Sequence, residues 1–178
     1  MNKRLSSLRT DRYFPEAVEL KENPLKIYTL HTKQELGITK KEAWDFFSNS
    51  ANLPLITPPW LDFNITSEID SKMYPGMIVT YTVSPFPKIR VKWVTEITHV
   101  KEPDYFVDEQ RFGPYKVWHH QHRFKETPGG VQVEDLVYYA MPFDPIGRIV
   151  NELLVKKQLR EIFQFRKRYL ENTFGGTD

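Results

Sequence analysis

The sequence predicts an α+β fold in which a curved antiparallel sheet of about seven strands packs around one long C-terminal helix. Three features of the sequence support this fold class. Alternating apolar and polar segments fill the middle of the chain, short turn sequences separate them, and a long amphipathic segment follows. Alternation with a period of two indicates strands, whereas apolar residues three and four positions apart indicate a helix.

The first regular element is expected to be a strand that begins at Leu25. Ile27 and Thr29 would share one half-buried face of this strand with Leu25, because side chains two positions apart point the same way. Residues 1–24 are polar and interrupted by prolines, so we expect them to form an N-terminal arm outside the domain, which spans residues 25–174.

Two short helices are expected after this strand. Thr39 and Glu42 form a capping-box pattern, in which their side chains accept hydrogen bonds from backbone N–H groups at a helix N-terminus. Ala43, Phe46 and Phe47 would then lie on one face of the first helix. A second helical turn follows and ends at two consecutive prolines, which cannot continue a helical ladder.

Six further segments are expected to be strands. Each alternates apolar and polar residues, and turn signals rich in proline and glycine separate them. They span residues 61–65, 77–83, 89–97, 105–109, 115–124 and 131–139. Because parallel neighbours need long crossovers, these short connections predict an antiparallel meander, with the first strand added at an edge.

The last element is predicted to be a helix from Pro145 to about Asn172, with Asp144 as its cap residue. Its apolar residues form a stripe that would cover the sheet. They are Ile146, Ile149, Val150, Leu153, Leu159, Ile162, Phe163 and Tyr169. Its basic residues are expected on the solvent-exposed face, where contact with anionic lipid is a second interpretation. They are Lys156, Lys157, Arg160, Arg166, Lys167 and Arg168.

The composition excludes several classes of protein. The 25 basic and 23 acidic residues leave a net charge of +2, without the strong basic excess of nucleic-acid-binding proteins. The absence of cysteine excludes disulfides and thiolate chemistry. No apolar run is long enough for a signal peptide or a membrane span, so a cytoplasmic location is expected.

A cavity is expected between the sheet and the long helix. The predicted inner faces carry large aromatic side chains, and rings on a strongly bent sheet line a space that curvature holds open. The residues expected to contact a ligand are Tyr81, Trp93, Tyr105, Trp118, His120, Tyr139 and Phe163. The alternative is that these rings fill an ordinary core.

One predicted strand also carries a group of polar residues. Alternation places His120 and His122 on one face with Trp118 and Phe124, and either histidine could face Asp135 on the next strand. This polar network could be a satisfied hydrogen-bonding network within the core. It could also orient a ligand or transfer protons, with a carboxylate orienting a histidine.

Metal binding by His120 and His122 is a third interpretation of the same residues. It needs further ligands, and only Asp135, Glu134 or Glu109 is expected to offer them. No metal, no cofactor and no catalytic residue is therefore assigned from the sequence.

Several strings in the chain are similar to a known superfamily. The segments 46–63, 108–124 and 141–148, together with Asp135, Val137 and Tyr139, resemble the START-like, or SRPBCC, superfamily. The subgroup that the chain looks like is the bacterial ligand-binding one, sometimes labelled cell division inhibitor. The resemblance covers roughly residues 25 to 172 and implies the Bet v 1-like helix-grip fold.

The resemblance also implies a range of functions. Members of the superfamily bind lipids, sterols, quinones, polyketides or plant hormones, and some cyclise or dehydrate polyketides. Their pocket residues differ between subgroups, and fold alone does not give function.

The expected function is binding of an apolar small molecule such as a lipid, quinone or polycyclic compound, with transfer of that molecule as an option. The alternatives are an enzyme similar to polyketide cyclases or dehydratases, and a protein-interaction module without a ligand. No nucleic-acid partner is expected, transient membrane contact is compatible with the sequence, and the oligomeric state is not indicated. An entrance is expected among the loops at residues 58–59, 84–88 and 143–146.

Overall fold

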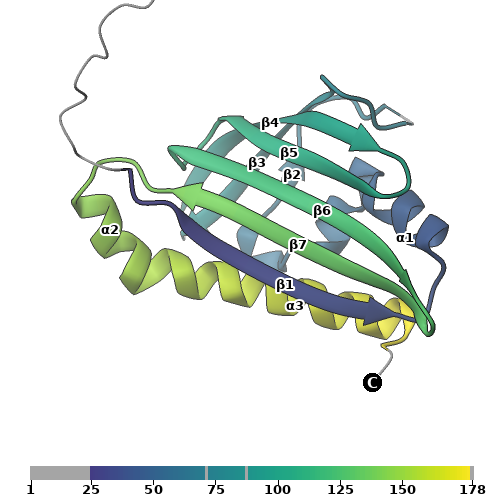
Figure 1. Ribbon diagram of the computed structural model, residues 1–178. Helices are drawn as coiled ribbons and strands as arrows, with labels where there is room; N and C mark the ends of the chain where they lie inside the picture. Colours follow the sequence, from purple (N-terminus) through teal and green to yellow (C-terminus); the bar gives the residue numbers. More distant parts are fainter. Residues whose placement is uncertain (1–24, 71, 87, 177–178) are drawn as a thin grey trace, which may run out of the picture.

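The computed structural model describes residues 25–70, 72–86 and 88–176. The N-terminal arm predicted for residues 1–24 lies outside the described residues. One curved sheet wraps around a long C-terminal helical segment, which runs along the sheet (Figure 1). This arrangement is the predicted α+β helix-grip fold.

The elements follow the predicted order. The sheet is made of β1 (Tyr28–Leu36), β2 (Asn64–Ile65), β3 (Ile78–Phe86), β4 (Ile89–Lys101), β5 (Tyr105–Phe112), β6 (Val117–Thr127) and β7 (Gly130–Ala140). The short helices between β1 and β2 are α1 (Lys40–Phe47), η1 (Ser50–Ile56) and η2 (Pro59–Leu61). The C-terminal segment comprises α2 (Ile146–Val150), η3 (Asn151–Val155) and α3 (Lys156–Phe174).

All neighbouring strands are antiparallel, in the order β1-β7-β6-β5-β4-β3-β2. The predicted meander, with the first strand added at an edge, is therefore confirmed. Strand β2 is shorter than expected, because Leu61 belongs to η2 and Asp62 has a left-handed backbone (φ 46°) that ends this turn.

Strand β1 presents the opposite face from the one predicted. Leu25 and Ile27 are exposed, whereas Tyr28 and Leu36 are buried. The ladder begins at Tyr28, which pairs with Tyr139 of β7, and the two rings stack with centroids 5.4 Å apart. The prediction counted alternate residues from Leu25, before the strand pairing begins, and so differs by one residue from the observed inward face. A shift of one residue moves every side chain of a strand to the opposite face.

Helix α1 begins as the sequence predicts. The Thr39 hydroxyl accepts a hydrogen bond from the Glu42 N–H, and the Glu42 carboxylate accepts one from the Thr39 N–H at 2.8 Å. Ala43, Trp44 and Phe47 are buried against the inner face of the sheet, so α1 closes one end of the core.

The C-terminal segment is helical from Ile146 to Phe174, close to the predicted extent, with one π-helical turn, η3. The predicted capping by Asp144 is wrong. Its carboxylate instead accepts hydrogen bonds from the Arg148 guanidinium at 2.6 and 2.5 Å, and Pro145 precedes the first helical residue.

Most of the apolar stripe predicted in the first half of this segment points to solvent, although Val150 packs against the second core cluster and lines the cavity. Ile146, Ile149 and Leu153 are 65%, 59% and 69% exposed. Gly147 and Asn151 are buried in their place.

Two contacts explain this rotation. Gly147 lies so close to Met141 and Pro142 that a side chain at this position would collide with the Pro142 carbonyl. The Tyr139 hydroxyl donates a hydrogen bond to Asn151 Oδ1 at 3.0 Å. The inward-facing residues then follow one another every four positions through the π-helical turn, because a π-helix has more residues per turn than an α-helix. Helical periodicity alone does not reveal these contacts.

In the described part of the chain, two apolar clusters make up the core. The first surrounds α1 and includes Phe124, Val133 and Leu170, whereas the second includes Val137, Leu159 and Phe163. On β6, β7 and α3 alike, the residues between the two clusters are polar and buried. They are His120 and His122 on β6, Asp135 on β7 and Arg166 on α3.

Among the described residues, no helix combines the length and apolar character that crossing a bilayer would require.

Candidate functional site

A cavity of about 290 Å³ lies between the inner face of the sheet and α3. Its walls come mainly from β3 to β6, the short helices and α3, and most of them are apolar. Most of the charged or titratable side chains in the wall lie in the region between the two core clusters. They are Asp108, His120, His122 and Arg166.

Five of the seven residues expected to contact a ligand line this cavity. They are Tyr81, Trp93, Trp118, His120 and Phe163. Tyr81 and Trp93 stack with ring centroids 5.7 Å apart, and Trp118 packs edge-on against Trp93 at 5.3 Å. Rings from β3, β4 and β6 therefore contribute to the cavity wall. Their contact with a ligand remains a prediction.

Tyr105 and Tyr139 do not line the cavity. The expected inward position of Tyr105 is wrong, because Phe106 and Asp108 occupy the inner face of β5 and Tyr105 lies at the surface. Tyr139 is buried, but its ring packs on Tyr28 and its hydroxyl is bound by Asn151.

Among the described residues of the loops expected to form an entrance, Pro85 and Phe86 at the end of β3 line the cavity, whereas Phe143 and Ile146 do not. The Gln158 side chain donates a hydrogen bond to the Pro85 carbonyl at 2.6 Å, which ties this turn to α3.

The polar residues form one cluster around two carboxylates. Asp135 Oδ1 accepts hydrogen bonds from His120 Nε2 at 2.9 Å and from Arg166 Nη1 at 3.1 Å. His122 Nδ1 lies 3.0 Å from the same oxygen, as an ion-pair contact without hydrogen-bond alignment. A single carboxylate oxygen therefore faces three nitrogen atoms.

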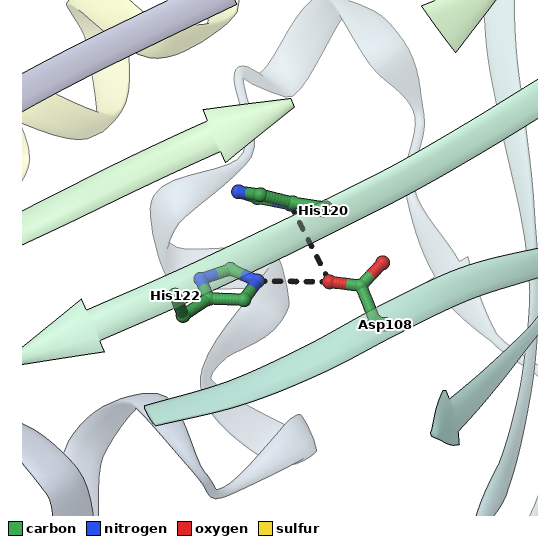
Figure 2. Close-up of side chains that lie close together, drawn as sticks. All are labelled: Asp108, His120 and His122. Atoms are coloured by element: carbon green, nitrogen blue, oxygen red, sulfur yellow. Dashed lines mark hydrogen bonds and ion pairs between the residues drawn. The ribbon is translucent and has the colours of Figure 1, made fainter. Parts of the chain in front are cut away.

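Asp108 closes the cluster on the other side (Figure 2). Its Oδ2 atom lies 2.8 Å from His122 Nε2 and 3.4 Å from His120 Nδ1. Each imidazole thus lies between two carboxylates. The register of the sheet explains this, since Asp108 is paired with His120 across β5 and β6, and His122 with Asp135 across β6 and β7.

Aromatic rings surround the cluster. The Phe106 ring stacks on His122 with centroids 4.1 Å apart, and the two imidazole rings are 3.8 Å apart. The Arg166 guanidinium lies over the rings of Phe47 and Phe163, at 5.3 and 5.6 Å from their centroids. These rings shield the charges from water and so strengthen the interactions among them.

The two carboxylates stay ionised despite their burial. Burial favours the neutral acid, but the Arg166 guanidinium and the hydrogen-bonded imidazoles hold the pKa of Asp135 well below its usual range. Burial likewise opposes ionisation of Asp108, yet His120 and His122 lower its pKa.

The two histidines differ in their proton affinity. Burial and the positive charge of His122 lower the pKa of His120. Burial also acts against charge on His122, but its contacts with Asp108 and Asp135 outweigh this and raise its pKa. These opposite directions favour a proton on His122 over one on His120, and with that one imidazolium the charges of Asp108, Asp135 and Arg166 would sum to zero.

The predicted partnership of the two histidines with Asp135 agrees with this geometry, whereas two members of the cluster were not anticipated. Asp108 lies two positions after Phe106 on β5, so alternation within that strand was the available signal. The expected solvent exposure of Arg166 is wrong, because it lies three positions after Phe163 and four before Leu170, in the buried stripe of α3. Asp135 compensates its charge there.

The chain shares its Bet v 1-like helix-grip fold with solved structures. Protein Ms6760 from Mycobacterium smegmatis superposes with a TM-score of 0.59 at 20% identity, over 82% of this chain and 92% of that one. Protein CV1439 from Chromobacterium violaceum superposes with a TM-score of 0.64 at 10% identity, over 84% of this chain and 99% of that one. Ara h 8.0201 superposes with a TM-score of 0.56 at 14% identity, over 83% of this chain and 100% of that one.

No protein-family profile and no curated protein matches the sequence. At these identities the structural likeness establishes the fold alone, and functional inference depends on the cavity.

Proposed function

We propose that the protein binds a compact, largely apolar small molecule in the internal cavity, with a polar group of that molecule directed toward the buried cluster. The observation that carries this proposal is the cavity itself, whose walls are apolar except for a few convergent polar groups. Such walls are typical of small-molecule sites, in which apolar burial gives affinity and a few polar groups fix orientation.

The cavity volume narrows the class of ligand. At about 290 Å³ it lies at the lower end of the roughly 300–1,000 Å³ typical of ligand pockets. A compact ring system suits this volume and the stacked rings of the wall better than a long-chain lipid.

A binding assay with a cavity-filling variant tests the proposal. Val83 is buried and lines the cavity, and Val83→Phe adds a ring to that space, whereas Ile89→Phe adds a ring at an exposed position of β4. We expect tryptophan fluorescence of the wild type to change saturably with a panel of naphthols and naphthoquinones. The response should survive Ile89→Phe and be lost in Val83→Phe, and equal responses in both variants would place binding elsewhere.

Acid–base catalysis is the second candidate function, and the cluster favours it. A histidine held by a carboxylate at the wall of an apolar cavity is a common arrangement for moving protons to and from a substrate. In that case His120→Gln would abolish turnover of a bound compound while leaving its binding intact. Loss of both together would assign His120 to binding, and a wild type that binds the compound without turnover would contradict catalysis.

Transient membrane contact during ligand transfer has a candidate surface. Ile146, Ile149 and Leu153 form an exposed apolar stripe beside the basic residues Lys157 and Arg160. Such a surface suits an anionic bilayer. Co-sedimentation with phosphatidylglycerol vesicles should be lost in the variant Ile149→Ser/Leu153→Ser, and unchanged co-sedimentation would exclude this surface.

A further inference from the structure

Three side chains of the cluster present metal-ligand atoms to a common point. They are Asp108, His120 and His122, whose candidate ligand atoms all lie within 4.8 Å of one another. His122 Nε2 and His120 Nδ1 lie 2.8 and 3.4 Å from Asp108 Oδ2. Ligands about 2.0–2.1 Å from a tetrahedral metal lie about 3.4 Å from each other, so small side-chain movements would suffice.

Asp135 is positioned to orient both imidazoles. It faces His120 Nε2 and His122 Nδ1, which are the ring nitrogens opposite to those that face Asp108. In a metal-bound state the ionised Asp135, which can only accept, would hold the protons on these two nitrogens, so that the lone pairs of the other two ring nitrogens are free on the Asp108 side. Metal-binding histidines are commonly oriented by a carboxylate in this way.

The Asp108 side of the cluster faces the cavity. Asp108, His120 and His122 line its wall, whereas Asp135 contributes instead to a groove between β1 and α3. Three protein ligands leave at least one coordination position for water or for a bound molecule. That position would open toward the apolar cavity.

We propose that Asp108, His120 and His122 bind a divalent transition-metal ion, with Asp135 as a positioning residue for both histidines. Two imidazoles and one carboxylate suit Zn²⁺ or Fe²⁺ with an open position. The proposal is independent of the organic ligand, since metal binding requires none.

The charges of the proposed metal site also indicate which kind of additional ligand would bind there. With both histidines neutral, Asp108, Asp135 and Arg166 together carry one negative charge. A divalent ion changes this to one positive charge. An anionic oxygen, such as hydroxide or a phenolate or enolate of a bound molecule, would then restore neutrality in the buried site.

Cobalt titration of the full chain, after removal of metal with a chelator, tests the proposal. We expect one Co²⁺ per chain, with visible absorption that added Zn²⁺ removes. Asp108→Asn and His122→Gln should abolish the absorption, and Asp135→Asn should weaken Co²⁺ binding about 10- to 100-fold. His119 and Glu109 form a second His–carboxylate pair on the outer face of the same strands, so His119→Gln and Glu109→Gln should change nothing.

Measurements on the wild type keep the proposal testable if a cluster variant fails to fold. In NMR spectra of the wild type, Co²⁺ should shift the imidazole resonances of His120 and His122 far more than those of His119. Absence of saturable Co²⁺ and Zn²⁺ binding would overturn the proposal and leave the cluster as a polar network. Shifts centred on His119, or on His31 and Glu134 at the surface, would overturn it as well.

Discussion

The two faces of strands β5 and β6 carry the same chemistry in opposite surroundings. On the outer face, His119 Nδ1 lies 2.8 Å from Glu109, and the two side chains are 30% and 28% exposed. On the inner face, His122 Nε2 lies 2.8 Å from Asp108, and these side chains are 5% and 14% exposed. The contact distance is the same, but water screens only the outer pair.

This difference shows why the inner pair defines a candidate site and the outer pair does not. Ion pairs at the surface contribute little, because solvent screens them. The inner pair belongs to a shielded cluster, in which every charge needs a specific partner and proton affinities shift in opposite directions.

The largest effect is expected from removing the one arginine of the cluster. Arg166→Met leaves Asp135 buried without its guanidinium partner. Breaking a buried ion pair from one side costs about 3–5 kcal/mol, so the free energy of unfolding in urea should fall by about this amount. Arg168→Met on the exposed side of α3 is the control, and a similar loss there would contradict the comparison.

The two faces of the C-terminal helical segment extend the comparison to apolar residues. Leu159 is buried in the second core cluster, whereas Leu153 is exposed. Leu159→Ala should lower the free energy of unfolding by about 2–5 kcal/mol. Leu153→Ala should change it by less than about 0.5 kcal/mol. If thermal and urea denaturation gave equal losses for the two variants, the observed rotation of the helix would be wrong.

Double-mutant cycles measure the inner and outer pairs directly. For His122 with Asp108 we expect a coupling energy of about 1–3 kcal/mol, in the upper part of the range for contacting residues. For His119 with Glu109 we expect about 0.2–1 kcal/mol, as for surface pairs. Phenylalanine at each histidine position and asparagine or glutamine at each acid provide the variants, and equal couplings would remove the distinction between the faces.

The loss of folding stability at low pH should show that Asp135 is ionised in the folded protein. Its folded-state pKa lies well below the value of about 3.9 expected in an unfolded chain. The stabilisation from this shift is therefore complete above that value and is lost as the pH falls toward the folded-state pKa. With metal removed, stability of the wild type should fall more steeply below about pH 4 than that of Asp135→Asn. Parallel curves would show that Asp135 is not held ionised.

Much of the sheet and part of the cluster could be predicted from local patterns. Alternation along β6 placed His120 and His122 together, and the following turn placed Asp135 opposite them. Asp108 was missed because its pairing depends on the register across the β5–β6 connection, which alternation does not fix. The predicted strand also ended at Glu109, whereas β5 continues to Phe112.

The long helix shows the limit of periodicity more clearly. Its apolar residues predicted an inward stripe through Ile149 and Leu153, but Gly147 and Asn151 face inward instead. Close approach at a glycine and one tyrosine–asparagine hydrogen bond set this rotation, and both depend on residues of β7 and the loop after it. Arg166 was predicted to be exposed to solvent because a buried charge needs a partner, and its partner Asp135 lies on a different element, β7.

Native mass spectrometry of the purified wild-type chain tests the central claim, that the inner face encloses a ligand-binding cavity, most directly. The wild type should carry a discrete added mass, either on purification or after incubation with naphthoquinones and naphthols, which disappears on denaturation. The folded Val83→Phe variant should carry none. A wild-type mass that stays at that of the chain alone after every incubation, or an adduct that Val83→Phe retains, would contradict the account.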